Sequence, residues 1–169
     1  DTLYKKINQS RQSSGITVEQ MRVPLGVIAM IYESRPNVTI DAAGLSLKSG
    51  NSIILRGGSE AINSNLILSS LIKKALLESK VSTDMVQIVK TIDRVAVSEL
   101  LKMDSYIDVI IPRGGKGLIK KVAEESKIPV IKHLDGNCHI YIDKDADFKT
   151  AMSCTINSKT QRYGVCNAA

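Results

Sequence analysis

Hydrophobic residues along the chain form short continuous runs that alternate with segments of helical spacing. The run VPLGVIAMIY at 23–32 is almost entirely apolar and rich in branched residues, which is typical of a strand buried on both faces. After Pro36, the segment 40–48 carries apolar residues at helical spacing and ends before Gly50, a residue favoured just beyond a helix end. The pattern therefore predicts a strand, a turn and a helix, in that order.

The same alternation continues along most of the chain. We expect further strands at 52–56, 85–89 and 107–111, and strand-like segments at 129–132 and 139–142. We expect further helices at 61–78, 95–101, 118–126 and 146–157. Strands separated by helical segments of this length predict an α/β fold, with a mainly parallel sheet and helices on both faces.

The composition is that of a globular chain with an aliphatic core. Of the 169 residues, 43% are hydrophobic, only 4% are aromatic, and the formal net charge is +6. Basic residues are scattered and aromatic residues are too sparse for a stacking platform, which argues against nucleic acid as a partner. No stretch approaches the roughly 20 apolar residues of a membrane span, and the N-terminus lacks the apolar core of a signal peptide. We expect no membrane partner and a cytoplasmic location.

Three cysteines are present, at positions 138, 154 and 166. Their odd number and their spacing suggest neither a disulfide framework nor a metal site, and they fit a reducing compartment. Cys166 follows Gly164 in a polar segment where a thiol could be exposed and activated, but free cysteines are more often inert. On the residue pattern alone, Cys166 is an ordinary cysteine.

Two glycine pairs lie between an expected strand and an expected helix, where phosphate groups are usually bound. They are Gly57-Gly58, followed by Ser59, and Gly114-Gly115. Glycines let the backbone approach a phosphate, the helix start favours an anion, and the neighbouring basic residues Arg56, Arg113 and Lys116 add charge. Such glycines can equally serve tight turns, and the chain contains no G-x-G-x-x-G fingerprint. We therefore expect any dinucleotide to bind in a different way from that of an ordinary Rossmann dehydrogenase.

Asn37 follows Pro36 in the expected loop after the first strand. Its amide could cap the next helix or donate to a reacting oxygen, and capping is the commoner role. We expect His133 to be structural, because the neighbouring Asp135 is a turn residue.

Four segments, 23–61, 111–119, 128–143 and 159–168, together resemble the gamma-glutamyl phosphate reductase family. The most specific blocks are Glu33-Ser34-Arg35-Pro36-Asn37 and Arg56-Gly57-Gly58-Ser59-Glu60. The resemblance implies the aldehyde dehydrogenase fold, which binds NADP through a Rossmann-like domain without the glycine fingerprint. It also implies reduction of L-glutamate 5-phosphate with NADPH to glutamate 5-semialdehyde and phosphate, a step of proline biosynthesis.

The resemblance also implies roles for individual residues. Cys166 matches the nucleophile that forms a thioester, and Asn37 matches the amide that stabilises the oxyanion. Arg35 and Arg162 are candidates for binding the phosphate or carboxylate groups of the substrate. The cofactor-binding residues matched by the family fall in two groups, Arg56, Gly57, Gly58, Ser59 and Glu60 at the adenosine ribose and its extra phosphate, and Arg113, Gly114, Gly115 and Lys116 at the pyrophosphate.

On this reading, residues 1–158 are an NADP-binding region that is incomplete at its N-terminus. Residues 159–169 begin a catalytic domain that is cut short, and the full-length enzyme is expected to be a homo-oligomer. Two alternatives stay open. The chain could belong to another acylating aldehyde dehydrogenase, or it could be an NADP-binding module without catalysis.

Overall fold

The structure is a computed structural model that describes residues 3–132 and 138–161. The chain divides into two compact units, residues 1–132 and residues 133–169.

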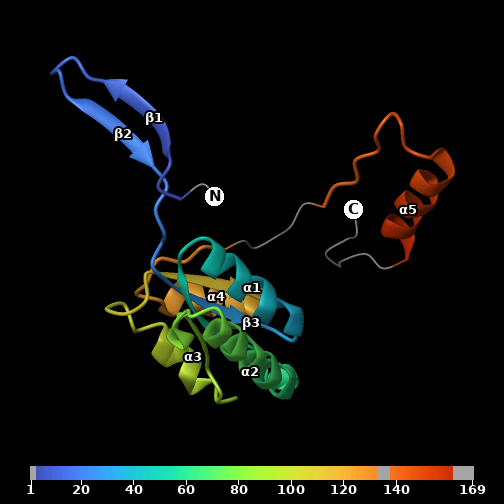
Figure 1. Cartoon of the computed structure of the whole chain (residues 1–169). Helices are drawn as coiled ribbons and strands as arrows, with labels where there is room; N and C mark the ends of the chain where they lie inside the picture. Colours follow the sequence, from blue (N-terminus) through green and yellow to red (C-terminus); the bar gives the residue numbers. More distant parts are fainter. Residues whose placement is uncertain (1–2, 133–137, 162–169) are drawn as a thin grey trace. The chain divides into compact units, whose positions relative to one another are not determined.

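A four-stranded parallel sheet forms the centre of the first unit (Figure 1). Its strands are β3 (Val27–Tyr32), β4 (Ser52–Arg56), β5 (Val86–Ile88) and β6 (Val109–Arg113), in the order β5-β4-β3-β6. Val27 pairs with Ser52 of β4, and Ile28 pairs with Val109 of β6. The two central strands are thus buried on both faces, which explains their nearly continuous apolar sequence.

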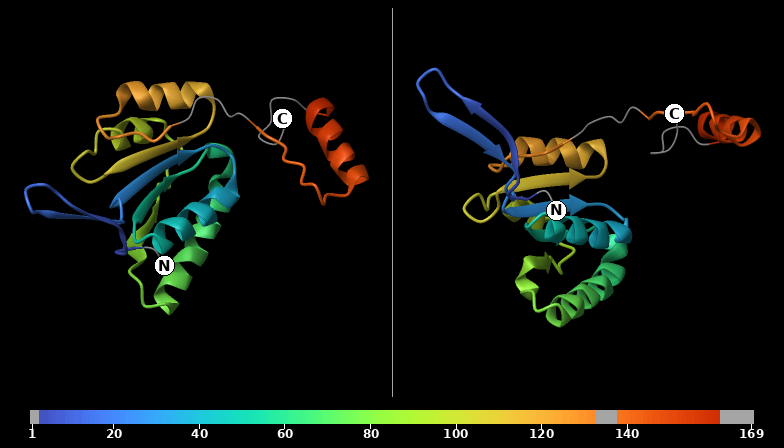
Figure 2. Two further views of the ribbon diagram at one scale, coloured as in Figure 1. Left: turned by 90° about the horizontal axis from the view of Figure 1, so that it is seen from above. Right: turned by 45° about the horizontal axis from the view of Figure 1, so that its top comes forward.

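Helices cover both faces of this sheet (Figure 2). On one side lie α1 (Pro36–Lys48) and α2 (Ile62–Glu78), and on the other lie α3 (Val95–Leu100) and α4 (Lys116–Glu125). Two short 3-10 turns, η1 (Ser59–Ala61) and η2 (Thr83–Met85), precede α2 and β5. The predicted parallel sheet with helices on both faces is confirmed.

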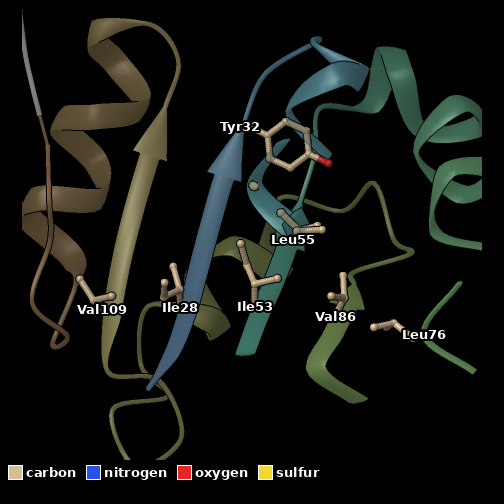
Figure 3. Packing of buried hydrophobic residues seen from close by; sticks show 9 residues of the cluster. Ile28, Tyr32, Ile53, Leu55, Leu76, Val86 and Val109 are labelled. Atoms are coloured by element: carbon tan, nitrogen blue, oxygen red, sulfur yellow. The ribbon is translucent and has the colours of Figure 1, made fainter. Parts of the chain in front are cut away.

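Alternate residues of β3 feed two separate hydrophobic cores. Ile28 and Tyr32 belong to the core on the α1 and α2 side, which Figure 3 shows with Ile53 and Leu55 from β4. Ala29 and Ile31 belong to the core on the α3 and α4 side. Because β3 contributes side chains to both cores, packing on both faces of the sheet fixes the position of its carboxyl end.

The sequence did not predict the antiparallel hairpin of β1 (Lys6–Arg11) and β2 (Thr17–Met21). Every residue of both strands is exposed. Exposed strands lack the alternation of apolar and polar residues by which a half-buried strand is recognised. An ion pair of 2.6 Å between Lys6 Nζ and Glu19 Oε1 joins the two strands.

The second unit contains α5 (Phe148–Thr160), close to the helix expected at 146–157. Asp147 caps its first turn, and one carboxylate oxygen accepts a hydrogen bond of 2.7 Å from the backbone amide of Thr150. The side chain of Asp thus satisfies one of the amides that a helix start leaves without an internal partner.

Several expected boundaries are corrected by the structure. Residues 139–142 form no strand, and residues 129–132 contribute only a single bridge between Val130 and Ile110. The first strand begins at Val27 instead of residue 23, and the following helix begins at Pro36 instead of residue 40. Pro is well placed in a first helical turn, because its missing N–H would have no intrahelical acceptor there.

Among the residues that the structure describes, no helix is long and apolar enough to cross a membrane. The described residues also contain no group of three or more His, Cys, Asp or Glu side chains that could hold a metal ion.

Candidate cofactor site

The carboxyl ends of β3, β4 and β6 lie at one edge of the parallel sheet. From β3 the chain passes through α1 to β4 on one side, and it later returns through α3 to β6 on the other side of β3. The direction of winding therefore changes between β3 and β6, and ligands of open α/β sheets bind at such a switch point. Glu33 follows β3 there, and Gly114-Gly115 follow β6.

A cleft of about 470 Å³ opens at this edge. It is lined by residues from the ends of β3 and β4, by Arg94 before α3, and by Gly117, Leu118 and Lys121 of α4. Four of the predicted cofactor residues line it, namely Arg56, Gly58, Ser59 and Glu60. The cleft is of the size found for small-molecule sites in proteins.

The turn after β4 is closely packed, most tightly at Gly57, which lies against the buried side chains of Asn65 and Tyr32. A Cβ atom on Gly58 would lie 2.5 Å from Glu60 Oε2 and 3.3 Å from the backbone nitrogen of Ser34. A Cβ atom on Gly57 would collide with Asn65 Nδ2 and would lie 3.1 Å from the hydroxyl oxygen of Tyr32. Both glycines therefore let the backbone of this turn approach its neighbours.

Arg56 is turned inward at the base of the cleft, with 9% of its surface exposed. Its Nη1 donates to the carbonyl of Gly57 at 2.9 Å, and its Nη2 donates to the carbonyls of Ile92 at 3.1 Å and Asp93 at 3.4 Å. Arg56 thus ties the turn after β4 to the loop before α3. Its Nε is buried and has no hydrogen-bond partner among the described residues.

A buried polar network lies beneath the same turn. The hydroxyl oxygens of Tyr32 and Thr39 are 2.7 Å apart, and Thr39 Oγ1 donates to Asn65 Oδ1 at 3.1 Å. Because the single hydroxyl proton of Thr39 goes to Asn65, Tyr32 is the donor to Thr39. Burial raises the pKa of Tyr32 above its ordinary value. The network joins β3, α1 and α2 under Gly57.

The turn after β6 holds the carboxylate of Glu33, the residue that follows β3. The backbone amide of Gly115 donates to Glu33 Oε1 at 2.9 Å. A Cβ atom on Gly114 would lie 2.6 Å from the Cδ atom of Glu33, so only glycine leaves room for this contact. One acidic side chain, Glu33, therefore bridges the loops that follow β3 and β6 at the switch point.

The remaining predicted site residues lie in other places. Arg35 is the residue before the first turn of α1, and Asn37 lies within that turn, exposed, with its amide donating to Asp41 Oδ2 at 3.2 Å. The interpretation of Asn37 as a helix cap is therefore wrong, because the side chain bonds another side chain instead of a helix amide. Arg162 and Cys166 lie outside the described residues, as does His133.

Sequence reasoning missed three features of this site. Arg94 and Lys121 line the cleft, and Glu33 bridges two loops. Only Glu33 carried a signal, because it directly follows the first parallel strand and such positions meet at one edge of the sheet. No sequence spacing connects Arg94 or Lys121 with that edge.

Comparisons with known proteins show the family to which the chain belongs. The chain matches the aldehyde dehydrogenase family over residues 1–169. It is 56% identical over 168 residues to the gamma-glutamyl phosphate reductase of Desulfotalea psychrophila, covering 99% of this chain and 40% of that protein. The resemblance stated from the sequence is therefore confirmed.

Two solved structures of gamma-glutamyl phosphate reductases have the same fold. That from Thermotoga maritima is 45% identical with a TM-score of 0.82, and the match covers 100% of this chain and 41% of that one. That from Saccharomyces cerevisiae is 37% identical with a TM-score of 0.68, and the match covers 94% of this chain and 40% of that one. The chain thus spans about 40% of the length of the curated relative that it matches. It belongs to the aldehyde dehydrogenase family.

Proposed function

We propose that this chain is the cofactor-binding part of an enzyme that reduces L-glutamate 5-phosphate to L-glutamate 5-semialdehyde and phosphate in proline biosynthesis. The observation that carries the proposal is the 56% identity with a gamma-glutamyl phosphate reductase over 99% of this chain. The cofactor is NADPH, the substrate is a small anionic molecule, and the enzyme is a cytoplasmic homo-oligomer.

The residues at the switch point fit a nicotinamide dinucleotide. The start of α4 offers backbone amides to a phosphate, and the glycine at position 114 leaves room for an anion to reach them. Arg94 and Lys121 place positive charge along the same cleft. Gly114 and Gly115 would contact the pyrophosphate, between Arg113 and Lys116.

The turn after β4 would hold the adenosine ribose. Ser59 and Glu60 are exposed there and line the cleft, so their side chains can contact a ligand. Arg56 would act mainly by holding the loop before α3, because both of its terminal nitrogens donate to carbonyl groups. Gly57 and Gly58 allow the close approach of the backbone.

The chemistry would depend on Cys166. Its thiolate would attack the acyl phosphate carbon, expel inorganic phosphate and keep the glutamyl group as a thioester. Bound NADPH supplies the hydride that is needed to release the aldehyde. Asn37 would donate its amide to the carbonyl oxygen as negative charge develops, which requires that it leave Asp41. Arg35 and Arg162 would bind the phosphate or carboxylate groups of the substrate.

The reverse reaction tests this proposal. Phosphate-dependent reduction of NADP+ by glutamate 5-semialdehyde should be lost in Cys166→Ala, while NADPH binding is kept. Cys154→Ala is the matched control, because Cys154 is an exposed residue of α5. Full activity of Cys166→Ala would exclude the covalent mechanism.

Two other outcomes correspond to the alternative functions. Turnover of an acyl-CoA in place of glutamyl phosphate would indicate another acylating aldehyde dehydrogenase. NADPH binding without turnover of either substrate would indicate a binding module. Turnover should therefore be measured both for the 169-residue chain and for a protein of the relatives' full length. Turnover by the longer protein alone would support the proposed reductase, and turnover by neither would indicate a binding module.

A further inference from the structure

The start of α4 is already occupied by an anionic side chain from elsewhere in the fold. Glu33 Oε1 accepts a hydrogen bond of 2.9 Å from the backbone amide of Gly115, the residue before the first turn of α4. This amide is among those that a helix start leaves without an internal partner. It is also one of those that the proposed pyrophosphate would use.

Two further features hold Glu33 in this position. The backbone nitrogen of Glu33 donates to the carbonyl of Arg113 at 3.1 Å, which extends the β3–β6 pairing by one residue beyond Tyr32 and Arg113. The missing side chain of Gly114 provides the space, because a Cβ atom there would lie 2.8 Å from Glu33 Cγ. The carboxylate is therefore directed to the helix start by the backbone and admitted by a glycine.

α4 offers no anionic partner of its own at this end. Its first turn contains no acidic residue and begins with Lys116, and the residue before it is a glycine without a side chain. Glu33 lies 82 positions earlier in the chain than Gly115. The negative charge that the helix dipole favours at this end is thus supplied by a different element.

From this geometry we propose that Glu33 is a resident anion that the phosphate of the cofactor must displace, so that Glu33 lowers the affinity of the site for NADPH. The inference rests on the proposed function. A carboxylate and a phosphate compete for one amide donor, and two like charges held close together repel each other even in water. Because Glu33 is exposed, its side chain can turn into solvent when the phosphate enters.

A purely structural role for Glu33 predicts a different behaviour. If Glu33 only capped α4, its removal would loosen the helix start and would leave phosphate binding unchanged or weaker. Displacement predicts the opposite sign, because removal of the negative charge frees the amide for the ligand. The direction of the change in affinity therefore decides between the two roles.

The test uses the whole 169-residue chain with Glu33→Gln, and with Glu33→Ala as a second variant that removes the acceptor entirely. Glu124→Gln is the matched control, because it removes the same charge from the last turn of α4, where Glu124 is 3.9 Å from Lys120. NADPH binding is followed by fluorescence titration. Binding of inorganic pyrophosphate is followed through the amide resonance of Gly115 in ¹⁵N-labelled protein.

We expect both Glu33 variants to bind each ligand about threefold to tenfold more tightly than the unsubstituted chain, the size expected for relief of one such repulsion. The control should bind as the unsubstituted chain does. Unchanged or weaker binding of pyrophosphate in both Glu33 variants, including no binding at all, overturns the inference.

The two ligands separate this inference from the proposed function. Tighter pyrophosphate binding without any NADPH binding supports displacement of Glu33 but contradicts the proposed cofactor. If the unsubstituted chain, both Glu33 variants and Glu124→Gln bind NADPH equally well, the result supports the cofactor and overturns the role of Glu33.

Discussion

The hydroxyl oxygens of Tyr32 and Thr39 lie 2.7 Å apart in the buried layer between β3 and α1. Tyr32 is 2% exposed, and Thr39 is fully buried and donates a hydrogen bond from its hydroxyl group to Asn65 Oδ1. This chain of bonds connects the last residue of β3 with two helices directly below the turn at Gly57. The position of that turn therefore depends on a polar network inside an apolar layer.

Replacing Thr39 with Val should lower the free energy of unfolding by roughly 1–3 kcal/mol, because Tyr32 and Asn65 would each lose a buried partner. Chemical denaturation measures this change. Thr17→Val is the matched control, since Thr17 lies in the exposed strand β2, and it should change stability by less than about 0.5 kcal/mol. Equal effects of the two substitutions would contradict a structural role for the network.

Tyr32 should make stability depend on pH in the alkaline range. Burial raises its pKa above the ordinary value of 10.0, so the unfolded chain loses this proton before the folded chain does. The contribution of Tyr32 to stability is complete below pH 10.0 and declines as the pH rises toward the pKa of the folded state. Tyr32→Phe should remove this part of the pH dependence, as measured by unfolding at a series of alkaline pH values. An unaltered slope in the variant would refute the assignment.

Replacing Arg56 with Lys should destabilise the turn after β4 and the loop before α3 together. A lysine cannot donate in the planar geometry by which the guanidinium reaches the carbonyls of Gly57, Ile92 and Asp93. We expect a loss of roughly 1–3 kcal/mol in the free energy of unfolding. Arg94→Lys, at an exposed position of the same cleft, should have little effect on stability. Amide hydrogen exchange at residues 91–93 should be faster in Arg56→Lys than in Arg94→Lys. This difference would show that the loop before α3 is destabilised.

Asp147 should make the start of α5 sensitive to acid. Hydrogen bonds from the side chain and backbone of Thr150 lower the pKa of Asp147 below its ordinary value of 3.8. The capping contribution is therefore present above pH 3.8 and is lost as the pH falls through the lower pKa of the folded helix. The amide resonance of Thr150 should report this titration. Asp147→Asn keeps an oxygen acceptor for the amide of Thr150, but the Thr150 resonance should no longer titrate. In Asp145→Asn, the titration seen at Thr150 should be unchanged.

The apolar run at 27–32 could be recognised from the sequence because both faces of β3 are buried, which leaves a nearly continuous row of branched residues. The glycine turns after β4 and β6 could be recognised because each lies between a strand pattern and a helix pattern. The exposed hairpin of β1 and β2 could not, because no burial imposes a period on its residues.

The sequence by itself determined the order of strands and helices from β3 to α4, the parallel sheet and the loops that form the candidate site, because burial and turn chemistry act on residues close together in the chain. The tertiary structure alone decided where side chains in those loops point. Arg56 turned inward to the carbonyls of Ile92 and Asp93, and Glu33 reached Gly115, 82 positions away. Such contacts depend on which strand ends lie side by side in the sheet, a relationship that no local pattern of residues contains.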